Sequence, residues 1–92
     1  MSETIQLEIV SPLKLIYKHE VDAIVVPGVL GQMGILPHHA AIVSALDIGV
    51  VKIKVDDSEF RMAISGGFLE VANNKAVILA ETAEKADKYI LA

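Results

Sequence analysis

Apolar and polar residues alternate along most of this chain, and this alternation predicts strands because successive side chains in a strand point to opposite faces. Ile5, Leu7 and Ile9 alternate with polar residues until Ser11 and Pro12 end the run. Runs of the same kind predict strands over residues 5–9, 15–17, 21–26, 50–55, 59–64, 68–72 and 76–81.

Turn residues separate these predicted strands and favour hairpins. Residues 56–58 (Asp-Asp-Ser) join one pair of strands, and Asn73 with Asn74 joins another, since asparagine tolerates the positive φ of tight turns. Residues 41–46 fit either a strand or a helical turn, and residues 47–49 are predicted as a turn. Short strands without crossover helices indicate an all-β fold, an antiparallel β-sandwich or flattened barrel.

The last residues change in character and predict the start of a helix. Thr82 is a possible N-cap, and Ala83, Ala86 and Ile90 fall at helical spacing. We therefore expect a sandwich domain over residues 1–82 and a short helical stub over residues 83–92.

Composition and charge exclude several classes of function. The chain has 92 residues, 53% of them hydrophobic, which is enough for one dense core. It lacks cysteine, so thiol chemistry and thiolate metal sites are excluded and a cytoplasmic location is the default. A formal net charge of −4 with scattered lysines argues against nucleic acid. No apolar run approaches the length of a membrane span, so any membrane contact is expected to come through a partner.

The stretch VPGVLGQMGILPHHA, residues 26–40, is predicted as a projecting loop. Its three glycines are not spaced as in a dinucleotide-binding loop, and Pro37 blocks the helix whose amides would hold a phosphate. We interpret Gly28, Gly31 and Gly34 as positive-φ turn positions. Exposed apolar residues on a loop favour contact with a partner, and the residues displayed here are Val29, Leu30, Gln32 and Met33.

Other candidate chemistry is sparse. His19, His38 and His39 are the only histidines, and adjacent histidines in an extended chain point in opposite directions, which disfavours a metal site. Ser65 lies outside any nucleophile motif, and the following Gly66 is interpreted with its neighbour as a bulge or tight corner. The residues therefore predict no catalytic, metal, nucleotide or cofactor site and favour an interaction module. A small ligand- or metal-binding module that uses the three histidines is the alternative.

Six motifs, taken in order, resemble the N-terminal β-sandwich domain of the epsilon subunit of F-type ATP synthases. The resemblance covers roughly residues 4–84, and its most specific part is GxxGxLPxHA followed downstream by SGGFLEV. The motifs are LEIVSP at 7–12, VDAIVVPG at 21–28, GQMGILPHHA at 31–40, LDIGVVKI at 46–53, ISGGFLEV at 64–71 and AVILAETAE at 76–84.

This resemblance implies a ten-stranded sandwich on the central stalk that links the gamma subunit to the c-ring and carries no catalysis of its own. It implies a c-ring contact through Val29, Leu30, Gln32 and Met33, and a gamma contact through Ser11 and His39. Attachment would be peripheral, at the cytoplasmic face of a bacterial cell membrane and only through the complex.

The sequence departs from the family pattern in three places. His38 stands where the family commonly has glycine, so the local turn is expected to differ, and Gln32 stands where an acidic residue is common. Many members also continue into a C-terminal pair of helices. Residues 83–92 are expected to be the start of that segment, in a chain that is either truncated or naturally short.

Overall fold

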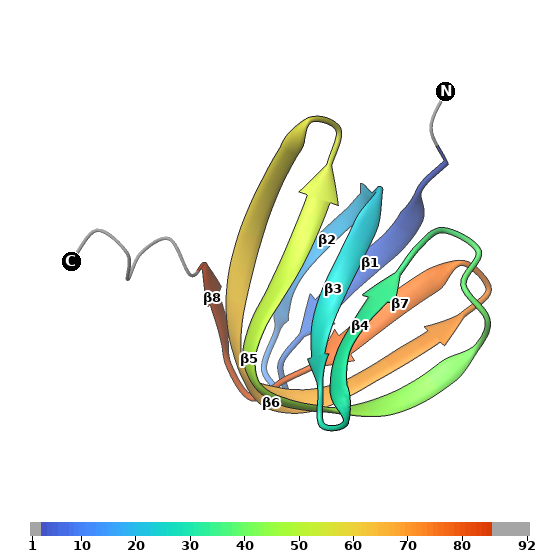
Figure 1. Cartoon of the computed structure of the whole chain (residues 1–92). Helices are drawn as coiled ribbons and strands as arrows, with labels where there is room; N and C mark the ends of the chain where they lie inside the picture. Colours follow the sequence, from blue (N-terminus) through green and yellow to red (C-terminus); the bar gives the residue numbers. More distant parts are fainter. Residues whose placement is uncertain (1–2, 86–92) are drawn as a thin grey trace.

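The protein is a β-sandwich built from one continuous sheet that folds over on itself (Figure 1). A computed structural model describes residues 3–85. Within these residues the strands are β1 (Ile5–Val10), β2 (Leu15–Val21), β3 (Ala23–Gly28), β4 (Gly31–Ile35), β5 (Ile42–Val55), β6 (Ser58–Ala72), β7 (Lys75–Leu79) and β8 (Ala83–Lys85).

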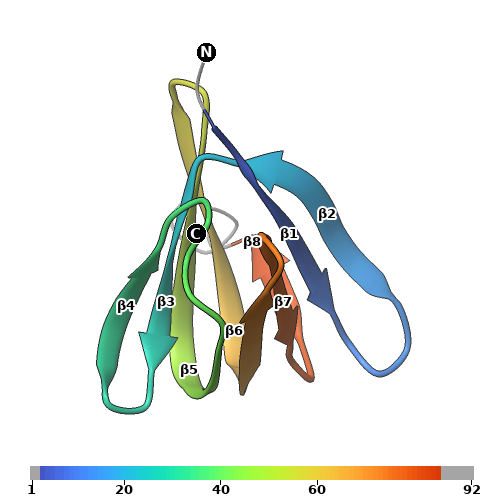
Figure 2. The same ribbon diagram turned by 90° about the vertical axis from the view of Figure 1, so that its right-hand side faces the viewer.

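The neighbouring strands are ordered β2-β1-β7-β6-β5-β3-β4, with β8 paired to β6. The long strands β5 and β6 belong to both layers of the sandwich, because residues 68–72 of β6 pair with β7 whereas residues 62–64 pair with β8. One layer contains β2, β1 and β7, the other contains β3, β4 and β8, and Figure 2 shows the two layers leaning together over the core. The predicted all-β sandwich is confirmed, but residues 3–85 contain eight strands where the resemblance implied ten, because β5 and β6 are each one long strand that passes through both layers.

One strand pair departs from the predicted antiparallel arrangement, because β1 and β7 are parallel. Parallel neighbours cannot be joined by a tight turn and require a long connection. Here the whole chain from β2 to β6 supplies that connection, as the register of Gln6 with Lys75 shows. The hairpin patterns in the sequence report only adjacent strands, and so they did not indicate this pairing.

The two layers meet at a corner in β5 and β6. The register runs from Leu46 opposite Gly67 to Ile48 opposite Ser65, which leaves Asp47 and Gly66 between the paired positions. Gly66 has φ 96° and Gly67 has φ 148°, and a Cβ on Gly67 would overlap the carbonyl oxygen of Leu79. The predicted tight corner at the glycine pair is therefore confirmed, whereas the turn predicted over residues 47–49 is wrong because β5 continues through the bend.

Alternating apolar residues fill the space between the layers, and no polar residue among residues 3–85 is buried. In β1, for example, Ile5, Leu7 and Ile9 are fully buried. The remaining large, fully buried side chains are Val21, Ile24, Val26, Ile35, Val51, Ile53, Leu69, Val71 and Ile78. A dense, wholly apolar core of this kind gives a rigid body.

The stretch predicted as a projecting loop is mostly a hairpin, with β3 and β4 paired from Ile24–Ile35 to Gly28–Gly31. Among its three glycines only Gly31 has positive φ, at 131°, so the predicted conformation is wrong for Gly28 and Gly34. Gly28 is required for a different reason, since a Cβ there would lie 2.6 Å from the carbonyl oxygen of Gly31.

The helix predicted from residue 83 does not begin there. Ala83 to Lys85 form β8 instead, with Ala83 opposite Ile64 and Lys85 opposite Met62. The open edge of β6 offers unpaired backbone groups to this segment, and ladder pairing outweighs a weak helical pattern. The rest of the predicted stub, residues 86–92, lies outside the described residues. The predicted Asn turn is confirmed, with φ 52° at Asn73 and 59° at Asn74.

Candidate interaction surfaces

The tip of the β3–β4 hairpin is an apolar projection held by the backbone. Leu30 is 101% exposed and Val29 53% exposed. The amide of Val29 donates to the carbonyl of Ala45 over 3.1 Å, which fixes the tip against β5. Gln32 is exposed as predicted, but Met33 is only partly accessible and packs against the core. The prediction that Met33 is displayed outward is wrong, because in a strand alternate side chains face the interior.

Further exposed apolar residues lie at the same end of the molecule as this tip. The β1–β2 turn, the bend of β5 and the β3–β4 turn all lie at the bottom of both ribbon views (Figures 1 and 2). The β1–β2 turn carries Leu13, which is 94% exposed, and the bend carries Ile48, which is 76% exposed. We call this end, with Leu13, Val29, Leu30, Gln32 and Ile48, the turn end.

The outer face of the layer that contains β1 and β7 is also apolar, and sequence patterns missed it. Its side chains form rows across the strands, and one row has no polar member: Ala45, Phe68, Leu79, Val10 and Leu15. At about 4.8 Å between strands, the four intervals of this row span about 19 Å. The adjacent row is mixed and contains Val43, Glu70, Val77, Glu8 and Lys18.

The apolar residues of these two rows line a shallow groove. We call this surface the outer apolar face, and its apolar residues are Val10, Val43, Phe68, Val77 and Leu79. Val43 is 75% exposed and Phe68 is 58% exposed. The signal in the sequence was that Phe68, Val77 and Leu79 interrupt the alternation expected of strands with one solvated face. Apolar residues on both faces indicate that both faces are covered, one of them by something other than the sandwich core.

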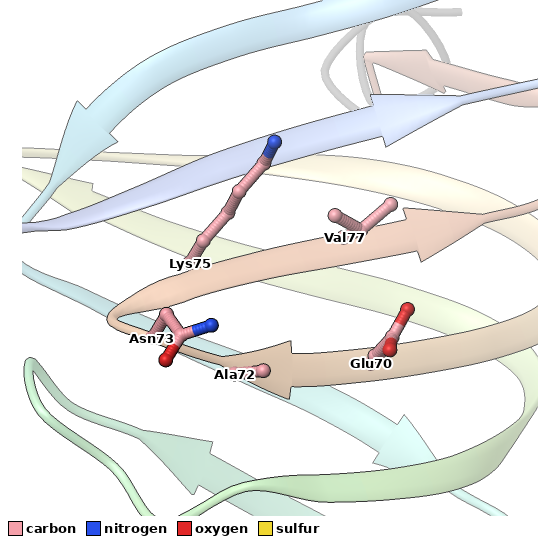
Figure 3. Close-up of a pocket in the computed structure, with 5 residues that line it drawn as sticks. All are labelled: Glu70, Ala72, Asn73, Lys75 and Val77. Atoms are coloured by element: carbon pink, nitrogen blue, oxygen red, sulfur yellow. The ribbon is translucent and has the colours of Figure 1, made fainter.

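A polar hollow adjoins the outer apolar face near the β6–β7 turn (Figure 3). It is lined by Glu70, Ala72, Asn73, Lys75 and Val77. The Lys75 ammonium lies 3.2 Å from the carboxylate of Glu8 on β1, so this cation already has a partner.

Ser11 and His39 lie close in sequence to two strands of the outer apolar face, Ser11 just after β1 and His39 shortly before β5. Ser11 directly follows Val10, and its hydroxyl oxygen accepts from the amide of Lys14 at 3.2 Å, which holds the β1–β2 turn. His39 precedes β5, and its Nδ1 lies 2.8 Å from the carbonyl of Ala40. The structure therefore gives each residue a local role in shaping a turn.

The three histidines do not form a metal site. Within residues 3–85 no three histidine, aspartate or glutamate side chains are grouped so that they could hold a metal ion. The His19 ring stacks edge-on against Tyr17 with 6.3 Å between centroids, and His38 Nε2 lies 3.4 Å from a carboxylate oxygen of Glu3. His38 has φ 64°, a left-handed conformation that glycine adopts without strain.

The Ser65 hydroxyl and the Tyr17 ring each make contacts that support the fold. The Ser65 hydroxyl accepts a hydrogen bond of 3.1 Å from the amide of Thr82, which leads the chain into β8. Tyr17 stacks on Phe60 with 5.5 Å between ring centroids, and burial raises the pKa of the Tyr17 phenol.

Comparison with known proteins gives a consistent result. Residues 4–86 match the family described as "ATP synthase, Delta/Epsilon chain, beta-sandwich domain". The ATP synthase epsilon chain of Desulforamulus reducens is 46% identical over 88 residues, which are 96% of this chain and 67% of that protein. The epsilon chain of Carboxydothermus hydrogenoformans is 44% identical over 96% of this chain and 66% of its own length. The chain thus spans about two thirds of these relatives.

Solved structures share the fold. A chain of the Euglena gracilis mitochondrial ATP synthase, solved as OSCP/F1/c-ring, superposes with a TM-score of 0.87 at 25% identity, covering 92% of this chain and 55% of that one. A chain from the Tetrahymena thermophila mitochondrial ATP synthase central stalk and c-ring gives a TM-score of 0.73 at 17% identity.

No helix long and apolar enough to cross a membrane is present in the part of the chain that the structure describes.

Proposed function

Because the chain belongs to the delta/epsilon β-sandwich family of ATP synthase subunits, we propose that it is a non-catalytic rotor module that links gamma to the c-ring. The observation that carries this proposal is the family match over residues 4–86, together with two exposed apolar surfaces on a rigid sandwich. Ion flow turns the ring, and the module keeps gamma fixed to it so that torque reaches the catalytic subunits.

The architecture suits a part that transmits torque. β5 and β6 run through both layers, so a force applied to one layer reaches the other through continuous backbone and an apolar core. Close-packed interiors have low compressibility and transmit strain.

The turn end is the proposed contact with the c-ring. Leu30 and Val29 project from a tip whose backbone is hydrogen-bonded to β5, and Gln32 is exposed beside them. Met33 supports this contact from inside, because it anchors the hairpin to the core. Leu13 and Ile48 extend the same surface.

The outer apolar face is the proposed contact with gamma. It presents Val43, Phe68 and Leu79 on adjacent strands, and central aromatic and aliphatic side chains of this kind contribute most of the energy of an interface. Ser11 and His39 flank it at the turns that precede and follow its strands, in keeping with the gamma contact expected of both residues. In this arrangement the chain would lie at the cytoplasmic face of a bacterial cell membrane, attached only through the complex.

Two substitutions test the two contacts separately. Leu30→Asp is expected to weaken binding to purified c-ring by about tenfold or more, and Phe68→Asp to weaken binding to gamma similarly, since charge at the centre of an apolar contact is costly. Each variant is the control for the other, because each should retain the second partner. Affinities are measured with each partner immobilised on a sensor surface. A wild-type chain that fails to bind gamma, or fails to bind the c-ring, would overturn the proposed function.

A further inference from the structure

Glu70 lines the groove of the outer apolar face and forms no ion pair within residues 3–85. Its cross-strand neighbours are Val43 on β5 and Val77 on β7, both apolar. The other acidic residue in this row, Glu8, is only 17% exposed and is neutralised by Lys75 at 3.2 Å. Glu70 is therefore a carboxylate without a cationic partner in the described residues, and it lies between two apolar side chains of this surface.

Lys75, on the neighbouring strand, does not neutralise Glu70. Figure 3 shows the Lys75 side chain extending toward β1, on the side away from Glu70. This direction agrees with its ion pair to Glu8 on β1. While that pair is kept, a cation for Glu70 must come from outside the described part of the chain.

Covering the outer apolar face would remove water from Glu70. A carboxylate that loses its water without gaining a cation opposes binding, whereas a carboxylate that is paired adds specificity to the contact. We propose that the partner segment that covers this face carries a lysine or arginine that pairs with Glu70, beside apolar side chains that fill the row of Phe68 and Leu79. This inference rests on the proposed function, in which the segment belongs to gamma.

The same charge argues against a second copy of this chain as the occupant. Each copy carries a formal net charge of −4, and both faces would present an unpaired Glu70. Like charges brought together at an interface oppose association and serve to exclude wrong partners. Glu70 would thus select a basic partner in addition to fixing its position.

The test measures binding to gamma at low and high salt. Glu70→Gln is expected to weaken affinity by about tenfold and to reduce its dependence on salt, and Glu70→Lys to weaken it further by repulsion. Asp57→Asn is the matched control, because it removes one charge from the distant, exposed β5–β6 turn and should change affinity less than twofold. Replacing the paired gamma cation by Glu should restore binding of Glu70→Lys.

The outcomes separate this inference from the proposed function. If wild type does not bind gamma, the proposed function fails at once. If Phe68→Asp weakens binding but Glu70→Lys does not, the gamma contact stands and the ion pair is overturned. Sedimentation of the chain alone provides a further check, because a wild-type dimer that Phe68→Asp dissociates would assign the face to a second copy and also overturn the inference.

Discussion

Asn74 joins three segments of the chain through one side chain and one carbonyl. Its Oδ1 accepts from the amide of His38 at 2.8 Å, and its Nδ2 donates to the carbonyl of Thr4 at 2.9 Å. Its backbone carbonyl accepts from the amide of Gln6 at 3.3 Å. Because the residue also has φ 59°, it combines a tight turn with a clamp on the β4–β5 loop.

We expect Asn74→Gly to lower the free energy of unfolding by about 1–3 kcal/mol, because glycine keeps the positive φ but leaves two backbone groups without their partners. Asn73→Gly is the control: Asn73 also has positive φ, and its side chain is exposed on the same turn. It should change stability by less than about 0.5 kcal/mol. Urea unfolding of both variants decides, and equal losses would show that backbone conformation alone matters.

Pro27 occupies an interior strand, which is unusual because proline lacks the N–H of a ladder bond. The β3–β5 register is interrupted between Val25 and Gly28, so the missing donor falls where β3 is not paired with β5, although Pro27 still lies opposite Gln32 of β4. The ring instead packs over Gly49, where an added Cβ would lie 2.9 Å from the Pro27 Cβ. Glycine at position 49 is therefore a packing requirement.

Gly49→Ala is expected to destabilise the protein by about 1–3 kcal/mol, since overpacking forces backbone or ring to shift. Gly34→Ala provides the comparison, because a Cβ there meets nothing within 4 Å and its backbone is not left-handed. That substitution should be neutral or slightly stabilising through the unfolded state. Thermal unfolding of the pair measures the difference, and a Gly49→Ala variant as stable as wild type would contradict the proposed contact with Pro27.

At the scale of the element, the β3–β4 hairpin separates residues that support the fold from residues that are free for contact. Met33→Asp should lower stability by about 2–4 kcal/mol, because it places a carboxylate against the core. Leu30→Asp, at the fully exposed tip, should change stability by less than about 0.5 kcal/mol. Circular dichroism during chemical unfolding tests both, and a loss of stability in Leu30→Asp would show that the tip packs elsewhere.

Local patterns predicted the elements that local physics determines. Alternation of apolar and polar residues predicted strands β1 and β7, and turn-forming residues predicted the turns at Asp56 and Asn73. The parallel β1–β7 pair and the attachment of β8 to β6 depend on residues distant in sequence, and no local signal reports them. The continuity of β5 was missed because Asp47 and Gly49 are residues typical of turns. Pairing with β6 outweighs their low strand propensity.

The candidate surfaces were predicted unevenly for a similar reason. Leu30 was correctly expected at an exposed tip, since flanking glycines mark a turn. The outer apolar face was missed because its members come from β1, β5, β6 and β7, and only the register places Val10, Val43 and Leu79 together. A surface built across strands is visible in sequence only as broken alternation, which does not show which strands adjoin.

At the scale of the whole molecule, the shared strands β5 and β6 join the two layers into one cooperative unit. Val51 and Ile53 pair with the first half of β6, and Ile53 also pairs with β3, whereas Leu69 lies in the part of β6 that pairs with β7. The β1–β7 pair forms between residues about 70 positions apart, so the sheet is completed only when both ends of the domain meet. We expect unfolding without separate transitions for the layers.

Leu69→Ala tests this cooperativity. Leu69 is fully buried, so the substitution should lower the global free energy of unfolding by about 2–5 kcal/mol through lost burial and a cavity. If the layers unfold together, amide hydrogen exchange should report the same loss at Ile78 in β7 and at Ile53 in the opposite layer. Val43→Ala, on the exposed outer apolar face, should leave both amides nearly unchanged. Weakened protection at Ile78 with Ile53 unaffected would mean that the layers open independently, and a body of that kind would absorb torque instead of transmitting it.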